Sequence, residues 1–226
     1  DPDTDTPVPF AELTVAEAEP PILPSDQCRG AGGEPMEAEP AGPIRLADAT
    51  LNRIGEDAYF TGSVEALSFD TYESVEVEIE LLDVENRVMA RYREEVPLVG
   101  KDHAQPIAIK TARRLFDRYA DHRYHCEPGT KLPSAWPIDD IAVEAAEANG
   151  ATRIKLSGVN QSGRDLERCL FVIHGKNNRG LAVAIWKVNW TQTLAPDEAF
   201  EFVIEPRLDP AWEVGYFEVV GVGIAR

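Results

Sequence analysis

Residues 75–81 read Val-Glu-Val-Glu-Ile-Glu-Leu, and this stretch decides the fold class. Apolar and acidic side chains alternate along it, which is the pattern of a β-strand with one face on a core and the other in water. Residues 83–87 form a polar turn, after which Val88, Ala90 and Tyr92 resume the alternation. The stretch predicts an antiparallel hairpin with one apolar face.

Further strands are predicted on both sides of this hairpin. They lie at 44–51, 59–65, 107–109 and 123–126, with a short connecting helix at 112–119. The second half of the chain has the same plan, with strands at 141–148, 154–158, 169–173, 182–190, 200–204 and 216–222. Asn149-Gly150 fits a two-residue hairpin turn, because both residues tolerate positive φ.

Two landmarks recur with equal separation in the two halves. Gly62 and Leu98 of the first half correspond to Gly158 and Leu194 of the second. A strand, a polar turn and a returning strand lie between the members of each pair, as expected for a repeated β-unit. The sequence therefore predicts an all-β protein with two tandem β-sandwich domains, at 44–130 and 131–226.

Residues 1–43 differ in composition from the rest, because prolines are interleaved with Glu, Ala and Gly. Such a segment buries too little apolar surface to fold alone, so an extended Pro-rich arm is expected. Residues 10–15 fit a short strand that adds to a sheet edge, with Phe10, Leu13 and Val15 as the partner-binding anchors. The alternative is a linker that lies over the first domain.

Several short motifs resemble a known family. Ile79-Glu80-Leu81-Leu82-Asp83 is similar to the signature of FxLyD-type domains, and 61–64 and 194–198 resemble two further segments of that family. The second half has Ile-His-Gly-Lys-Asn at 173–177 in place of the naming motif, so its assignment depends on spacing. The resemblance implies two immunoglobulin-like sandwiches in an accessory or adhesive protein of the cell surface, with no catalytic residues to carry over.

The charge and hydropathy of the chain argue against some classes of function. The formal charge of −18 argues against nucleic-acid binding, which needs a basic surface. No apolar run approaches the roughly 20 residues of a membrane span. The chain begins at Asp1 without a Met, which fits a processed or truncated product. Lysine is scarce beside arginine, as in proteins of salt-loving organisms, although an ordinary acidic surface explains the composition equally well.

Candidate chemistry is sparse. His122 and Cys126 would converge on a metal ion if they lay on a helix. On a strand they would lie about 13 Å apart, and we expect a strand. The sequence has no nucleophile elbow, metalloprotease motif or phosphate-binding loop, so we expect no enzyme activity, no cofactor and no catalytic or metal-binding residue. A glycosidase site built from two distant carboxylates stays open.

The three cysteines allow one disulfide. Cys169 alternates with Phe171 and Ile173, so it is expected to be a buried, reduced thiol. This leaves Cys28 and Cys126 as the predicted pair, a bridge that would hold the arm against the first domain. The alternative is three reduced thiols.

Two sequons add to the expectation of a secreted protein. Asn160 is followed by Gln-Ser and Asn189 by Trp-Thr, and both positions are expected to accept a glycan without disturbing the core.

The resulting functional expectation is a non-enzymatic extracellular or cell-surface protein that serves assembly or adhesion. Its partners would be other protein subunits, including copies of itself bound through the arm. The alternative is an extracytoplasmic ligand-binding module of a transporter or sensor, which would use loops at a sandwich end. A fragment of a carbohydrate-active enzyme is the third hypothesis.

Overall fold

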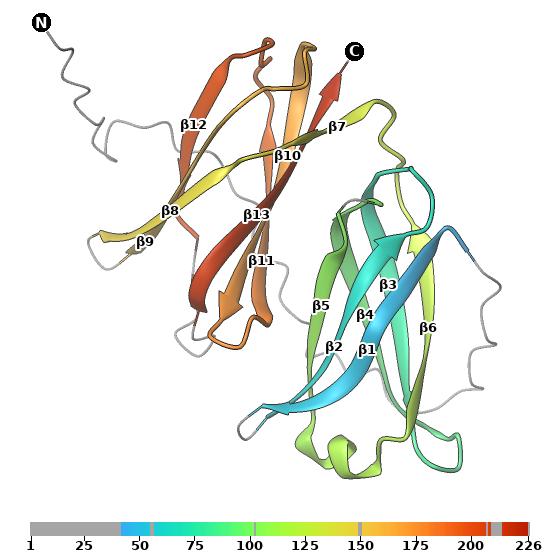
Figure 1. Ribbon diagram of the computed structural model, residues 1–226. Coiled ribbons are helices and arrows are strands. Elements are labelled where there is room, and N and C mark those ends of the chain that lie inside the picture. Colours follow the sequence, from blue (N-terminus) through green and yellow to red (C-terminus); the bar gives the residue numbers. More distant parts are fainter. Residues whose placement is uncertain are drawn as a thin grey trace, which may run out of the picture. The chain divides into compact units, whose positions relative to one another are not determined.

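The computed structural model shown in Figure 1 describes residues 42–54, 57–101, 103–148, 151–206, 208 and 214–225. The predicted all-β class is confirmed, since nearly all regular structure is antiparallel strand. The first half contains β1 (Ile44–Ile54), β2 (Asp57–Ala66), β3 (Tyr72–Leu82), β4 (Val88–Val99), β5 (Gln105–Thr111), the 3₁₀ helix η2 (Arg113–Arg118) and β6 (Asp121–Pro128). The second contains β7 (Ala135–Ile138), β8 (Ala142–Ala148), β9 (Ala151–Val159), β10 (Leu166–Asn177), β11 (Ala182–Trp190), β12 (Ala199–Ile204) and β13 (Val214–Ala225).

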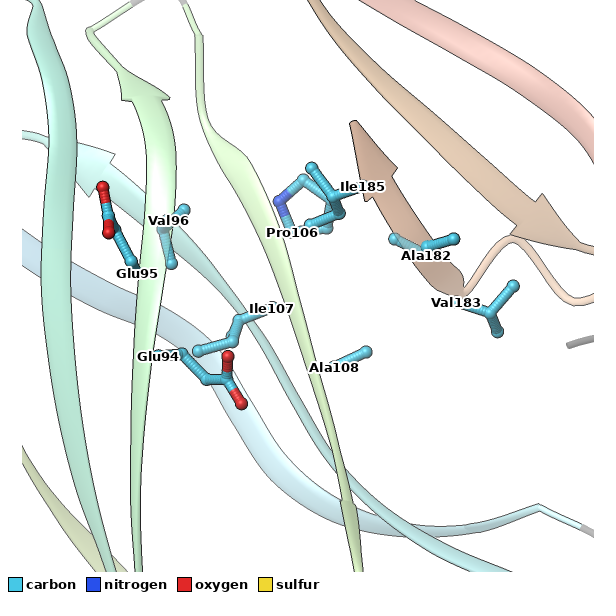
Figure 2. Close-up of a pocket in the computed structure, with 10 residues that line it drawn as sticks. Glu94, Glu95, Val96, Pro106, Ile107, Ala108, Ala182, Val183 and Ile185 are labelled. Atoms are coloured by element: carbon cyan, nitrogen blue, oxygen red, sulfur yellow. The ribbon is translucent and has the colours of Figure 1, made fainter. Parts of the chain in front are cut away.

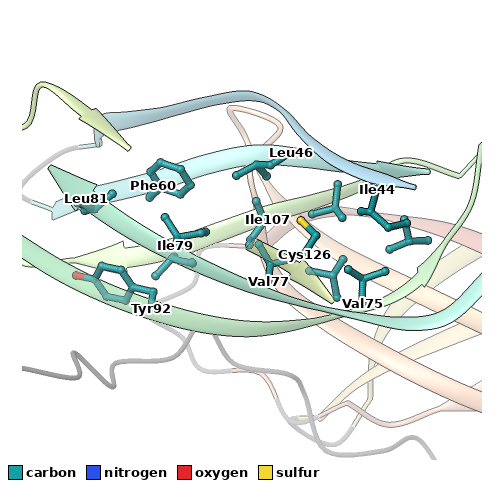
Figure 3. Packing of buried hydrophobic residues seen from close by; sticks show 14 of the residues in the cluster. Ile44, Leu46, Phe60, Val75, Val77, Ile79, Leu81, Tyr92, Ile107 and Cys126 are labelled. Carbon is teal, nitrogen blue, oxygen red and sulfur yellow. The ribbon is translucent and has the colours of Figure 1, made fainter. Parts of the chain in front are cut away.

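The first sandwich consists of the sheets β1-β2-β5 and β4-β3-β6. Figure 3 shows its core, where Phe60 and Leu46 of one sheet lie opposite Ile79 and Val77 of the other. The apolar residues of the opening motif are fully buried here, so the predicted inner face of β3 is confirmed. Burying one such side chain stabilises the fold by about 1.5–3 kcal/mol.

The second sandwich consists of the sheets β12-β9-β8 and β11-β10-β13-β7. Phe171 of β10 lies 5.2 Å from both Phe200 and Phe202 of β12, measured between ring centroids, and these contacts join the two sheets. By alternation, Leu170 and Val172 face away from this core, yet both are buried. Strand β10 is therefore buried on both faces.

The two sandwiches repeat one strand order. The sheet β1-β2-β5 corresponds to β8-β9-β12, and β4-β3-β6 corresponds to β11-β10-β13. Gly62 pairs with Ile107 of β5, and Gly158 pairs with Phe200 of β12, so the two glycines occupy equivalent positions. A Cβ on Gly158 would lie 2.8 Å from the Phe200 ring, which explains why this position carries no side chain.

Some predictions fall on residues outside the described part of the chain. These are the arm before residue 42, with Phe10, Leu13, Val15 and Cys28, and the Asn149-Gly150 turn. The strands on both sides of that turn are present, and Ala148 pairs with Ala151. The predicted strand at 141–148 is therefore confirmed as β8.

Candidate interaction site

The two sandwiches differ at one sheet edge. In the second sandwich, β7 lies beside β13 as an antiparallel neighbour, with Ile138 opposite Gly221 and Ala135 opposite Ile224. The strand that corresponds to β13 in the first sandwich is β6, and among the described residues β6 ends its sheet. Within the described part of the chain, the position that β7 occupies in one copy has no paired strand in the other.

The counterpart of β7 can be located in the first sandwich. Asp48 and Asp140 both have positive φ, at 51° and 54°, and mark the same bend in the two copies. In the first copy this bend is a register shift inside β1, between Ala47 and Thr50. In the second copy it separates β7 from β8. Together, β7 and β8 thus correspond to the single strand β1.

The first half of β1 pairs with β2 rather than with β6. Ile44 lies opposite Ala66, and Ala47 lies opposite Ser63. The pairing is extended by the backbone N–H of Leu67, which donates to the carbonyl of Pro43 at 2.7 Å. The segment of the first sandwich that corresponds to β7 is therefore hydrogen-bonded to β2 and does not pair with β6.

Strand β6 has a core face and an outer face. His122 lies 5.2 Å from Phe60 between ring centroids, and Cys126 is buried in the core shown in Figure 3. The outer face carries Asp121, Arg123, His125 and Glu127 in alternation with them. Charged side chains on an edge strand reduce indiscriminate pairing, so a strand that adds to β6 has to match them.

The outer face of the sheet β4-β3-β6 is a charge ladder rather than a plain carboxylate surface. Glu80 lies in register with Arg91 on one side and Arg123 on the other. Arg91 Nη2 lies 2.6 Å from Glu80 Oε1, and Glu80 is 0% exposed. The expectation that this face meets water is therefore wrong at Glu80, because arginine side chains from the neighbouring strands cover the carboxylate.

His122 belongs to an aromatic cluster. The Tyr119 hydroxyl and His122 Nδ1 share a hydrogen bond of 3.0 Å, and the rings of Phe60 and Tyr124 lie nearby. Burial lowers the pKa of His122, although Asp121 opposes this shift. The segment is a strand, as expected, so His122 and Cys126 are separated along β6. Within the described residues, no group of three or more His, Cys, Asp or Glu side chains is arranged to hold a metal ion.

The predicted cysteine pair stays a prediction. Cys28 lies outside the described residues, and no disulfide is present in the part of the chain that the structure covers. Because Cys126 is buried, a bridge to it would have to form inside the first core. Cys169 is 0% exposed and is a free thiol, as expected. Burial raises its pKa to about 11, so the thiolate is strongly disfavoured.

Asn160 is placed differently from the sequence-based expectation. It is 1% exposed, and its Nδ2 lies 2.7–2.9 Å from the carbonyl oxygens of Arg164, Leu194 and Ala195. Its Oδ1 accepts from the Ser162 hydroxyl at 2.6 Å. The expectation that Asn160 accepts a glycan without disturbing the core is wrong, because a glycan on Nδ2 would break these bonds. Asn189, the other predicted site, is half-buried on β11.

Loops gather at one end of the first sandwich. Phe69, on the β2–β3 loop, is 86% exposed, and the Lys101 ammonium lies 3.6 Å from its ring centroid. Lys131 bonds to Asp70 of the same loop at 2.7 Å. An exposed aromatic ring with a neighbouring cation is a reasonable contact point for a ligand or partner.

Figure 2 shows a small hollow where Glu94 of β4, a buried carboxylate, lies beside Ile107 of β5.

In the described part of the chain, no helix has the length and apolar character needed to cross a membrane.

Comparison with protein-family models finds no match, and comparison with curated proteins finds no similar protein. The resemblance to FxLyD-type domains therefore stays a prediction, and the function has to be argued from the geometry above.

Strand β7 was not predicted from the sequence, and neither was the difference between the two sandwiches at the sheet edge. Its four residues contain Pro137, which interrupts the strand signal. The usable signal was the repeated Asp at the bend, Asp48 and Asp140, and it became visible only with the backbone angles.

Proposed function

We propose that this chain is a non-enzymatic structural protein of the cell surface or extracellular space, which assembles with other protein subunits. The observation that carries the proposal is that β6 ends its sheet among the described residues, whereas its counterpart β13 in the second sandwich has β7 beside it. An open edge offers unpaired backbone groups to an added strand, and such pairing joins molecules through main-chain hydrogen bonds.

Two further features support this function. Of the reactive side chains that the sequence offered, Cys126 and Cys169 are buried, and His122 is partly buried against the ring of Phe60. The strongly acidic, arginine-rich composition keeps an extracytoplasmic surface hydrated and soluble. The N-terminal arm supplies a segment that can pair with a sheet edge, with Phe10, Leu13 and Val15 as its anchors.

The experiment is a sedimentation-velocity comparison of the full chain with a chain that lacks residues 1–20, each over a range of concentrations. The full chain should form oligomers, and the deleted chain should remain monomeric with an unchanged β-rich circular dichroism spectrum. A full chain that stays monomeric at every concentration would contradict assembly.

A second candidate function is the ligand-binding module, and Phe69 is the observation that favours it. Its ring is exposed on a loop at a sandwich end, where two lysines also lie. A ligand that stacks on this ring would bind the monomer. Phe69→Ala should then abolish ligand binding. The oligomeric state of the chain should not change, because assembly does not depend on Phe69.

A further inference from the structure

The loop between β2 and β3, residues 67–71, carries the most exposed large apolar side chain in the described part of the chain. This side chain is Phe69, and Leu67 of the same loop is half exposed. We infer that the loop is the docking site of an acidic segment of the same chain, residues 34–39, which read Glu-Pro-Met-Glu-Ala-Glu. The inference goes beyond the proposed function, which concerns residues 1–20.

This end of the first sandwich is basic, although the chain as a whole is strongly acidic. The sequence contains only six lysines, and two of them, Lys101 and Lys131, lie at this loop. Lys131 pairs with Asp70 at 2.7 Å, whereas the Lys101 ammonium lies 3.6 Å from the ring centroid of Phe69. A segment that suits this site therefore combines an apolar side chain with a carboxylate.

The described chain begins beside the same loop. The backbone N–H of Leu67 donates to the carbonyl of Pro43 at 2.7 Å, and Ile44 lies opposite Ala66. An extended chain spans about 3.3 Å per residue, so residues 34–39 lie within roughly 13–30 Å of Pro43 along the chain. This segment can therefore reach Phe69 while Pro43 keeps its bond to Leu67.

The side chains of the segment match the site. The thioether of Met36 is flexible and makes favourable contacts at the edge of an aromatic ring, which suits Phe69 with a cation over one face. Glu37, the next residue, supplies a carboxylate for the Lys101 ammonium. Pro35 restricts the backbone before Met36, which reduces the entropy lost when the segment docks.

The short connection to Pro43 favours the chain's own segment over other occupants. A short tether raises the effective concentration of a segment to about the millimolar range, so the same segment of a second copy competes poorly in dilute solution. An untethered acidic peptide would also be repelled by the formal charge of −18. A ligand that stacks on Phe69 would have to displace residues 34–39.

The test uses NMR of the full chain, carbon-13-labelled at the methionine methyl groups. The chain contains two methionines, Met36 and Met89, and Met36→Leu assigns their signals. Met89 packs against the first core and is the internal reference. The Met36 signal should differ in chemical shift from its value in the urea-unfolded chain, and it should show a nuclear Overhauser effect to aromatic ring protons.

Phe69→Ala should return the Met36 signal to its unfolded value and leave the Met89 signal unchanged. Lys101→Glu should move the Met36 signal in the same direction, because it replaces the cation by a carboxylate. Val84→Ala is the matched control, since Val84 is a similarly exposed apolar residue on the β3–β4 turn. It should change neither signal.

Dilution should leave the Met36 signal unchanged, whether or not the chain assembles. A Met36 signal at its unfolded value in the full chain would overturn the inference. A shift that disappears on dilution would assign the docked segment to a second copy, which overturns it as well. A shift that survives both Phe69→Ala and Lys101→Glu would place the segment on another part of the chain, with the same consequence.

Discussion

The single residue Asn160 holds two loops of the second sandwich together through its side-chain hydrogen bonds. Its Nδ2 is shared among three backbone carbonyls, and a buried carbonyl left without a donor costs about 1–3 kcal/mol. We expect Asn160→Ala to lower the free energy of unfolding by at least about 2 kcal/mol in urea titrations. Ser162→Ala should cost clearly less, and equal losses in the two variants would contradict this role of the amide.

His122 gives the first sandwich a pH dependence. Burial lowers its pKa in the folded state, so the unfolded chain binds the proton more readily. The stabilisation from neutral His122 is complete above the unfolded pKa of about 6.5 and is lost as the pH falls below it. Urea midpoints should therefore drop between about pH 7 and pH 5.

His122→Gln should flatten this part of the pH profile. Tyr119→Phe should keep it, because burial, and not the hydrogen bond with Tyr119, is the main cause of the lowered pKa of His122. A slope that survives in His122→Gln would assign the pH dependence to another group.

The turn of the β3–β4 hairpin is stabilised by the side chain of Asp83. Its carboxylate accepts the backbone N–H groups of Glu85 and Arg87 at 3.0 Å, and it pairs with the Arg87 side chain at 2.8 Å. These bonds, led by the one from the Arg87 side chain, lower the pKa of Asp83 to about 2. The stabilisation is complete above the unfolded pKa of 3.8 and is lost as the pH falls towards 2.

Asp83→Asn should therefore destabilise the protein at neutral pH and weaken its acid sensitivity between these two values, as measured by thermal unfolding. Glu85→Gln, at an exposed position of the same turn, is the control. Equal effects of the two substitutions would contradict the special role of Asp83.

Gly158 of β9 lies opposite Phe200 of β12. A methyl group there would meet the Phe200 ring at 2.8 Å, and overpacking of this kind costs about 1–3 kcal/mol. Gly158→Ala should lower the urea midpoint, whereas Ser157→Ala on the same strand should change it little. An unchanged midpoint in Gly158→Ala would show that the ring moves aside freely.

Much of the strand pattern could be predicted from the sequence, and the reasons lie in particular elements. Residues 75–81 alternate strictly between apolar and acidic side chains, because their inner face fills a core and their outer face does not. Strand β7 lacks this signal, since it is short and contains Pro137. The burial of Glu80 and Asn160 depends on partners distant in sequence, which local patterns do not encode.

Across the whole molecule, the two sandwiches repeat one strand order but differ at one sheet edge. The second copy closes it with β7, and the first copy leaves it open within the described residues. The difference lies in one segment, which pairs with β2 in the first copy and, as β7, with β13 in the second. Assembly then needs only a donor segment, for which the arm is the candidate.

The most direct measurement is hydrogen exchange of the β6 amides in the full chain and in the chain lacking residues 1–20, at a concentration where the full chain assembles. The account predicts that residues 121–128 are protected in the full chain and lose protection in the deleted chain. The amides of β4, the opposite edge of the same sheet, should exchange alike in both. Equal exchange of β6 in the two chains would contradict the account.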